Sequence, residues 1–546
     1  MADDLAEVAV TIVDERLAEE AAPLVEQLAN ERVASKLTAQ DPTLWGPEAE
    51  SEAAIRLSWT TLHETSRPLL AEIDALRADL RAEGVDRVVL AGMGGSSLAP
   101  EVITSTAGVP LVVLDTTDPH QVADALAGDL SRTVLVVSSK SGSTVETDSH
   151  RRIFEQAFNA SGIDAASRIV VVTDPGSPLD TLATEAGYRK VFRADPHVGG
   201  RYSALTAFGL VPAGLAGADV AALLDDAAAA ARQLSVDGKE NPALRLASAL
   251  GAAHARGAEK VVFATVPIQD GGSGITGFGD WVEQLIAEST GKNGTGLLPV
   301  VVEGPDAPGF AGAGPDATPV AIGQPGDVAP LGTDGSLGGL LLLWEYATAF
   351  AGRLLAINPF DQPDVEAAKK AARALLDAPG TDAGEPSLVD GPVEVYGSDG
   401  LLPPGTGSLS EALQAFLAAA PQLGYISVQA YLDRLDDASA IVLRPELARR
   451  TGLQATFGWG PRFLHSTGQY HKGGHHNGVF LQLTGAVEKD LEVPDRPYTL
   501  GTLQRAQALG DGHVLAELGR PVLRLHLTDR AAGIAHVVRV LQEVNR

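Results

Sequence analysis

One stretch, Ser138–Thr147, limits what this chain can fold into more than any other part of it. It follows the apolar run Thr133–Val137, and its first seven residues hold five hydroxyls, Lys140 and a glycine. This order predicts a buried strand, a turn and a helix start, where unpaired backbone N–H groups meet the positive end of the helix dipole. Such a turn is either an anion site, with phosphate the commonest anion, or an ordinary hydroxyl-rich helix cap. The stretch alone leaves both interpretations open.

Short apolar strands and helical segments alternate along the chain from Val85 onward. The expected strands are Arg87–Ala91, Leu111–Asp115, Thr133–Val137 and Arg168–Pro175. Alternation at this spacing predicts an α/β fold with a mostly parallel sheet and helices on both faces. Ligands of such sheets bind at the carboxyl ends of the strands, and both glycine- and serine-rich turns of this region fall there.

The first of these turns, Gly92–Glu101, has two of the three glycines of a dinucleotide-binding fingerprint. The third would fall at position 97, which is Ser97, and a partial fingerprint is weak support for a dehydrogenase. The segment Gly94-Gly95-Ser96 instead fits a small phosphate loop, in which glycines allow close approach and a hydroxyl binds an oxygen.

Four parts are expected along the chain. Residues 1–83 are predicted to be a helical N-terminal segment. Residues 84–240 and 241–392 each carry strand and helix patterns of an α/β domain, and residues 376–392 have the Asp, Ala, Pro, Gly and Ser content of a linker. Residues 393–546 form an additional α/β region with strands and helices of its own.

Composition excludes several classes of protein. With 41 basic and 70 acidic residues the formal charge is −29, which argues against nucleic-acid and anionic-membrane partners. The chain has no cysteine, so disulfides, thiolate zinc sites and thiol nucleophiles are excluded. The acidic start lacks the pattern of a signal peptide, and no apolar run reaches membrane-spanning length. We therefore expect a cytoplasmic protein.

Two further positions combine chemistry with suitable surroundings. Arg201 follows Gly199 and Gly200, so a rigid five-donor cation comes after a flexible turn. Gln284 and Glu288 are four residues apart on a predicted helix, and so lie on one face of it. Each has an ordinary alternative, a surface arginine beside a turn and a solvated glutamate at a helix end.

A histidine-rich segment lies late in the chain. His465, His471, His475 and His476 fall within Leu464–Gly478. A zinc site is one interpretation, but the segment holds no cysteine or acidic residue. A histidine that handles protons fits the glycine-rich, basic loop better.

Taken together, several of these stretches resemble the glucose-6-phosphate isomerase family, whose fold is two sugar-isomerase (SIS) α-β-α sandwich domains. The motifs occur in the family's order over residues 87–370. They are Gly94-Gly95-Ser96, Ser139-Lys140-Ser141, Gly199–Gly209, Glu288–Lys292 and Phe360–Lys369.

The resemblance implies a role for each matching residue. Glu288 resembles the general base that moves a proton between C2 and C1, Arg201 the cation that holds the enediolate, and Lys369 the lysine that assists ring opening. Gln284 and Gln362 are similar to substrate contacts. The residues that resemble the family's phosphate-binding set are Gly95, Ser96, Ser139, Lys140, Ser141 and Thr144.

The chain departs from the family at its ring-opening histidine. In the family this residue lies between the catalytic glutamate and the Phe-Asp-Gln motif, whereas here no histidine lies between Glu288 and Lys369. We hypothesise that His471, in Gly468-Gln469-Tyr470-His471, supplies it by a rearranged chain order, with His475 and His476 as rivals. The late segment also resembles the isomerase half of bifunctional transaldolase–isomerase proteins, although no barrel of about 250 residues precedes it.

The resemblance implies an aldose–ketose isomerase of glycolysis and gluconeogenesis. It would interconvert glucose 6-phosphate and fructose 6-phosphate through a cis-enediol, without metal or redox cofactor and as a homodimer. One alternative is an isomerase that also accepts mannose 6-phosphate. Another is a non-catalytic SIS-type sensor of sugar phosphates, which would not need Glu288, Arg201 and Lys369.

Overall fold

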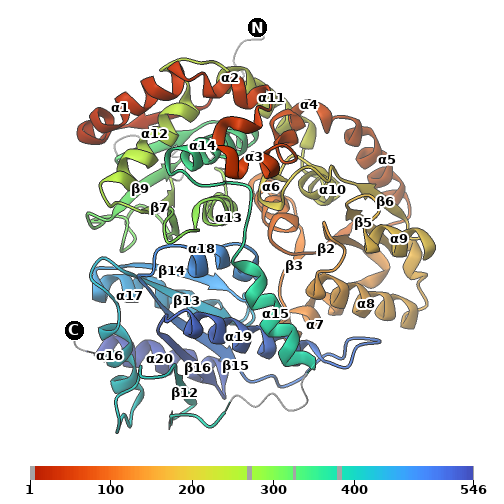
Figure 1. Cartoon of the computed structure of the whole chain (residues 1–546). Helices are drawn as coiled ribbons and strands as arrows, with labels where there is room; N and C mark the ends of the chain where they lie inside the picture. The colour runs from red at the N-terminus through yellow and green to blue at the C-terminus, as the bar shows by residue number, and fades with distance from the viewer. Residues whose placement is uncertain (1–6, 267–273, 324–327, 378–383, 545–546) are drawn as a thin grey trace.

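The strands of the molecule form three sheets, of five, five and six strands. The computed structural model describes residues 7–266, 274–323, 328–377 and 384–544. Figure 1 shows three α/β units, with the third, in blue, below the other two. Within the described residues, every helix is too short or too polar to cross a bilayer.

The first unit contains the hydroxyl-rich turn. Its parallel strands have the order β3 (Val112–Leu114), β2 (Arg87–Gly92), β4 (Thr133–Ser138), β5 (Ile169–Thr173) and β6 (Lys190–Arg193). Alternate valines and leucines face two cores, since helices cover both faces. One face carries α6 (Leu98–Ala107) and α10 (Ala207–Ala216) and the other α7 (Pro119–Ala127), α8 (Val145–Ala160) and α9 (Pro178–Glu185).

The second sheet is sandwiched between helices and the third unit. Its order is β1 (Ala9–Ile12), β10 (Leu331–Asp334), β9 (Ala317–Ile322), β7 (Lys260–Thr265) and β8 (Leu298–Val301). One face packs on α11 (Val220–Leu234), α12 (Pro242–Ala255), α13 (Phe278–Thr290) and α14 (Leu337–Leu354). The other face packs partly on Tyr425, Tyr470 and Phe480 of the third unit. The third unit therefore supplies part of the second sandwich's outer layer.

The third sheet is parallel at its centre and antiparallel at one edge. Its order is β11 (Leu388–Asp390), β12 (Val393–Gly397), β16 (Val522–Leu527), β15 (Gly478–Gly485), β13 (Tyr425–Tyr431) and β14 (Gln454–Trp459). Its helices are α16 (Leu409–Ala418), α17 (Leu443–Thr451), α18 (Gly468–Gly473), α19 (Leu500–Glu517) and α20 (Arg530–Glu543). Helix α15 (Val365–Asp377) leads from the second unit to the third and packs along α19 (Figure 1).

The N-terminal segment differs from the expected all-helical segment. Its helices are α1 (Glu15–Asn30), α2 (Val33–Thr38), α3 (Pro47–Ala53), α4 (Leu62–Thr65) and α5 (Pro68–Ala82). Before them, β1 pairs antiparallel with β10 of the second sheet. Its four residues are too few to show a periodicity against the helix-favouring sequence that follows, and pairing with the sheet decides their conformation. The glycine-, proline- and alanine-rich residues 303–337 contain two strands, β9 and β10.

An ion cluster centred on the buried Arg462 joins the third unit to the other two. Arg462 Nη1 lies 2.6 Å from Glu101 Oε2 and 3.0 Å from Asp115 Oδ2, both of the first unit. Its Nη2 lies 3.2 Å from Asp280 of α13. Burial opposes ionisation of Glu101, but the charges of Arg462 and Arg434 outweigh it and lower the pKa of this carboxyl to about 2.

Removal of the Arg462 guanidinium should therefore destabilise the whole fold. We expect Arg462→Ala to lower the free energy of unfolding by about 3–5 kcal/mol, because it leaves buried carboxylates without a counter-charge. Urea unfolding followed by circular dichroism measures the change. Arg132→Ala, which removes an exposed partner of Asp86, is the control and should have little effect. Equal stability of the two variants would contradict this account.

Candidate active site

Three short turns and one helix meet where the first and third units approach α13. The turns are η3 (Gly94–Ser96), η6 (Gly200–Tyr202) and η8 (Arg462–His465). Gly95 faces Gly200 so closely that an added Cβ would lie 2.0 Å from the Gly200 carbonyl oxygen. The glycine is therefore required for contact between the expected phosphate loop and the turn that carries Arg201.

Glu288 and Arg201 form a buried pair at this junction. Arg201 Nε lies 3.5 Å from Glu288 Oε2, and the side chains are 4% and 8% exposed. Gln284, one helical turn before Glu288, has its Nε2 3.4 Å from Glu288 Oε1 and also donates to the backbone oxygen of His465, at 2.9 Å. Helix α13 thus presents both expected residues to one place.

The surroundings of Glu288 make it a stronger base than an exposed glutamate. Burial raises the pKa of its carboxyl, and the charge of Arg201 and the hydrogen bond from Gln284 oppose that rise only in part. The more distant charges of His465 and Lys369 act in the same direction as Arg201. A buried carboxylate with a raised pKa, held beside a fixed cation, is suited to taking and returning a proton.

Arg201 also fixes the Phe360-Asp361-Gln362 loop. Its Nη2 donates to the backbone oxygens of Phe360 and Asp361, each at 3.0 Å, and to Gln362 Oε1, at 3.3 Å. Within the described residues its Nη1 is buried without a hydrogen-bond partner. One nitrogen thus orders the loop while a second donor remains for a bound oxygen.

Lys292 holds the same loop from the other side. Its Nζ donates to Asp361 Oδ1 at 2.6 Å and to two backbone oxygens, those of Asn358 and Asp361, at 2.7 Å each. Burial, followed by the charge of Arg201, lowers the pKa of Lys292 to about 8. Lys292 belongs to the Glu288–Lys292 motif, but the motif did not indicate that this lysine holds the Phe360–Gln362 loop.

The hydroxyl-rich turn forms the expected helix start. Ser139 Oγ lies 3.0 Å from Thr144 Oγ1 and accepts from the backbone N–H of Gly142 at 3.1 Å. Ser141 and Ser143 hydroxyls lie 2.9 Å apart. Thr144 precedes α8 but makes no side-chain cap of it. The turn therefore keeps hydroxyls and first-turn N–H groups together at the positive end of α8.

A cavity of about 290 Å³ lies beside this turn. Ser141, Thr144, Lys369 and His465 are among the residues that line it. Lys369 comes from α15, and its Nζ donates to Glu366 at 2.9 Å. The group of carboxylates in the described residues that could share a metal ion, Asp124, Asp433 and Asp436, includes none of the cavity's lining residues.

His465 is the histidine that the structure brings to this cavity. Its Nε2 lies 3.0 Å from Glu146 Oε1, in the first turn of α8. Gln507 of α19 donates to the same oxygen at 2.6 Å. Burial disfavours the charged carboxylate, but the charge and hydrogen bond of His465 outweigh it and lower the pKa of Glu146. The imidazole is thus held by an anion from the phosphate turn itself.

The other histidines of the late segment have different partners. His471 is buried, with Nδ1 3.1 Å from the Tyr425 hydroxyl and Nε2 3.4 Å from Ser427 Oγ. Burial lowers its pKa well below that of a free histidine. The exposed His475 pairs with Glu259 at 2.9 Å, and His476 is also exposed. None of the three lines the cavity.

Lys140 does not turn toward the hydroxyls around it. Its Nζ donates to Asp174 Oδ2 at 2.7 Å and to the backbone oxygen of Pro196 at 3.0 Å. The lysine therefore anchors the turn to the end of β5, 34 residues further along the chain, and its charge is already paired. Of the expected phosphate set, Ser141 and Thr144 line the cavity beside the turn, whereas Lys140 turns away and Gly95, Ser96 and Ser139 lie outside the lining.

Sequence reasoning missed His465, Glu146 and Gln507. Both His465 and Glu146 lie within stretches that were singled out, but neither has a local signal that separates it from its neighbours. Their contact spans 319 residues and Gln507's spans 361. Only the packing of the third unit on the first brings them together.

A buried glutamate beside a fixed guanidinium, with a hydroxyl-rich helix start in an α/β sandwich, is the arrangement expected of a sugar-phosphate isomerase. The sequence profile of the family described as Phosphoglucose isomerase matches residues 72–296. The probable glucose-6-phosphate isomerase of Natronomonas pharaonis is 31% identical over 365 residues, which cover 57% of this chain and 83% of that protein. This chain belongs to the glucose-6-phosphate isomerase family.

Further comparisons agree. The glucose-6-phosphate isomerase of Citrifermentans bemidjiense is 30% identical over 403 residues, covering 61% of this chain and 74% of that protein. A solved glucose-6-phosphate isomerase of Chlamydia trachomatis shares the fold, with a TM-score of 0.53 and 21% identity over 68% of this chain and 89% of that one. The likeness to the isomerase half of bifunctional transaldolase proteins stays a prediction.

The contact between Gly95 and Gly200 allows a direct test of the site's assembly. We expect Gly95→Ala to lower kcat/KM by more than about 10-fold, because the added methyl group separates the Ser96 loop from the Arg201 turn. Steady-state kinetics measures the loss. Gly199→Ala is the matched control, since an added Cβ there meets nothing within 4 Å. Equal activity of the two variants would show that the close approach is not needed.

Proposed function

We propose that this chain interconverts glucose 6-phosphate and fructose 6-phosphate by ring opening and proton transfer through a cis-enediol. The observation that carries the proposal is the buried Glu288 carboxylate, 3.5 Å from the buried Arg201 guanidinium. Aldose–ketose exchange needs one base that removes and returns a proton, and a fixed cation where negative charge develops. The names of the relatives favour neither a mannose 6-phosphate isomerase nor a sensor.

Proton transfer between the carbons is assigned to Glu288. It removes the proton from C2 of the open-chain aldose and returns it to C1, while a proton passes from the C2 hydroxyl to the C1 oxygen. No atom is gained or lost overall. The intermediate is an enediolate, and the Nη1 donor of Arg201, which has no partner among the described residues, is placed to bind its oxygen.

Ring opening is assigned to His465 and Lys369 in place of His471. Opening requires a proton for the ring oxygen and removal of a proton from the C1 hydroxyl. His465 and Lys369 line the same cavity, and Glu146 holds the imidazole by one nitrogen, which leaves the other for the substrate. His471 uses both ring nitrogens in contacts with Tyr425 and Ser427.

The phosphate is assigned to the hydroxyl turn. Ser139, Ser141 and Thr144 present hydroxyls at the start of α8, and Ser96 lies on the facing glycine loop. Binding of the unreactive phosphate positions C1 and C2 over Glu288, so its binding energy contributes to the rate. The charge of Lys140 is engaged by Asp174, so it acts on the phosphate only from a distance.

We further propose that the protein works as a homodimer in the cytoplasm, as the family resemblance implies.

Replacement of the base tests the central step. We expect Glu288→Gln to lower kcat by about 10²–10⁴-fold, since Gln keeps the shape but cannot accept the proton. Glu283→Gln, on the same helix, is the control, because it makes the same change of side chain at a residue that no contact among the described residues joins to Arg201. The assay is isomerisation of fructose 6-phosphate with EDTA present. Undiminished activity of Glu288→Gln would remove Glu288 from the mechanism.

The raised pKa of Glu288 predicts the acid limb of the pH profile. The base acts only when ionised, so kcat/KM should fall as the pH falls through its pKa, which burial places above the 4.5 of an ordinary glutamate. A pH–rate profile of the wild type measures this limb. A profile that stays flat down to pH 4.5 would contradict the burial of a catalytic carboxylate.

The assignment of ring opening to His465 predicts that its replacement acts differently from replacement of His471 or His475. We expect His465→Ala to slow ring opening by about 10²–10⁴-fold, and His471→Ala and His475→Ala to change it by less than about threefold. Exchange between the two anomers of glucose 6-phosphate, followed by NMR, reports ring opening alone. Slow anomer exchange in His471→Ala, with a normal rate in His465→Ala, would reverse the assignment.

A further inference from the structure

The third sheet is polar on one face, which is unusual for strands buried among helices. Val428, Leu481 and Leu525 face an apolar core. Doubly covered parallel strands ordinarily have apolar side chains on both faces. On the other face here, Tyr425, Phe480 and Val522 pack in a second apolar core, but the remaining residues at alternate positions are polar. They are Ser427, Gln429, Tyr431, Gln482, Thr484, Arg524 and His526.

A cavity of about 570 Å³ lies at the end of this polar face. Tyr431 ends β13 and Gly485 ends β15, and both line the cavity. The chain runs from β13 outward to β14, then back to β15 and outward to β16 in the other direction. The cavity therefore lies at a point where the strand order reverses, outside carboxyl ends of parallel strands, which is where open α/β sheets bind ligands.

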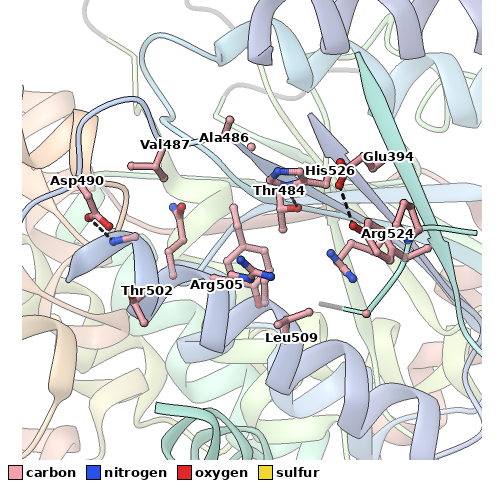
Figure 2. A pocket seen from close by; sticks show the side chains of 18 of the residues that line it. Glu394, Thr484, Ala486, Val487, Asp490, Thr502, Arg505, Leu509, Arg524 and His526 are labelled. Atoms are coloured by element: carbon pink, nitrogen blue, oxygen red, sulfur yellow. Dashed lines mark hydrogen bonds between the residues drawn. The ribbon is translucent and has the colours of Figure 1, made fainter. Parts of the chain in front are cut away.

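Basic side chains from two elements line the cavity. Arg505 comes from α19, and Arg524 and His526 come from β16 (Figure 2). The Arg524 guanidinium lies over the Tyr396 ring, 3.8 Å from its centre. Burial, and also the charge of Arg505, lowers the pKa of Arg524, so the two arginines feel each other's charge. These side chains share the lining with three acidic residues, Glu385, Glu394 and Asp490, and burial lowers the pKa of His526.

Two acidic residues of the lining have hydrogen-bond partners that the structure describes. Glu394 accepts from the Tyr396 hydroxyl at 2.8 Å. Asp490 accepts from Thr499 Oγ1 at 2.6 Å and from the Gly501 backbone N–H at 2.8 Å, at the start of α19 (Figure 2). Glu385 also lies on the rim. Glu394 and Asp490 thus support the walls.

Neutral donors complete the lining. Tyr431 is fully buried, and its hydroxyl has no hydrogen-bond partner among the described residues. Burial raises its pKa well above that of a free tyrosine, so it stays an O–H donor. Thr484 Oγ1 lies 3.0 Å from His526 Nδ1. A buried hydroxyl donor without a partner indicates a place where a ligand atom is expected.

We propose that this cavity is a second ligand site, which binds a small phosphorylated metabolite and is separate from the isomerase site. The two guanidinium groups suit phosphate oxygens because of their planar, multiple donors. The volume is within the roughly 300–1,000 Å³ of small-molecule sites. This site does not rest on the proposed isomerase reaction.

Helix α19 connects this site to the active-site cavity. Arg505 and Leu509 line the new cavity, whereas Leu503 and Gln507 line the other. Gln507 donates to Glu146, which holds His465. The helix also approaches α15, the element of Lys369, so closely that a Cβ on Gly510 would lie 2.8 Å from the Ala372 nitrogen. A ligand that moves α19 therefore acts on the ring-opening residues.

Calorimetric titration with inorganic pyrophosphate tests for the site. We expect two binding events per wild-type chain. The double variant Arg505→Gln with Arg524→Gln should lose one, and Ser139→Ala with Thr144→Ala, in the active site, should lose the other. Arg16→Gln with Arg132→Gln, which removes the same charge from the surface, should keep both. A single event, lost only with Ser139 and Thr144, would overturn the proposal.

A milder variant guards against loss of folding in the double arginine variant. Tyr431→Phe removes only the hydroxyl and should weaken the second event by about 5–10-fold with unchanged circular dichroism. An unchanged affinity would count against the site. Absence of isomerase activity in the wild type would contradict the proposed function but would leave both binding results standing.

Hydrogen exchange tests the connection through α19. In Ser139→Ala with Thr144→Ala, where pyrophosphate reaches only the second site, it should slow amide exchange in α19 and in residues 462–466 by at least about threefold. Arg505→Gln with Arg524→Gln should show no such change. Protection of α19 without any change in residues 462–466 would leave the site but overturn its link to His465.

Discussion

One guanidinium, that of Arg201, holds the active site together. It faces Glu288 on α13, orders the Phe360–Gln362 loop and lies on the turn that contacts Gly95. A charge removed from water is stabilised only when its partners are fixed around it. Burial of the Arg201–Glu288 pair costs desolvation free energy, and it also raises the pKa of Glu288. The arrangement that supports the site therefore also makes Glu288 a stronger base.

Local patterns in the sequence predicted local features of the site. The strand, hydroxyl turn and helix start around Ser139 are as expected, and the Arg201, Glu288 and Gln362 motifs meet in space. The choice of histidine could not be predicted from local patterns. His465 and His471 lie in the same segment, and only contacts with distant parts of the chain give them different surroundings. Tyr425, 46 residues away, takes His471 onto the sheet, and Glu146, 319 residues away, takes His465 into the cavity. Spacing along the chain carries no information about either contact.

The third unit, which comes last in the chain, contributes both to the packing of the second sheet and to the candidate active site. Its Tyr425, Tyr470 and Phe480 cover part of the second sheet, and its η8 turn brings His465 to the phosphate turn. The alternation of polar and apolar residues in β13, β15 and β16 is visible in the sequence, but it is also typical of half-exposed antiparallel strands. Only the observed parallel pairing shows that the polar side faces helices, and so that it lines an interior space.

The short strand β1 has a consequence for handling the protein. It covers the edge of the second sheet by pairing with β10, and its own Val10 is buried in the core. A chain that began after Ile12 would retain every proposed catalytic residue, yet it would present the unpaired N–H and C=O groups of β10 to its neighbours. Such an edge is a template for pairing between molecules, so strand β1 protects solubility at high concentration.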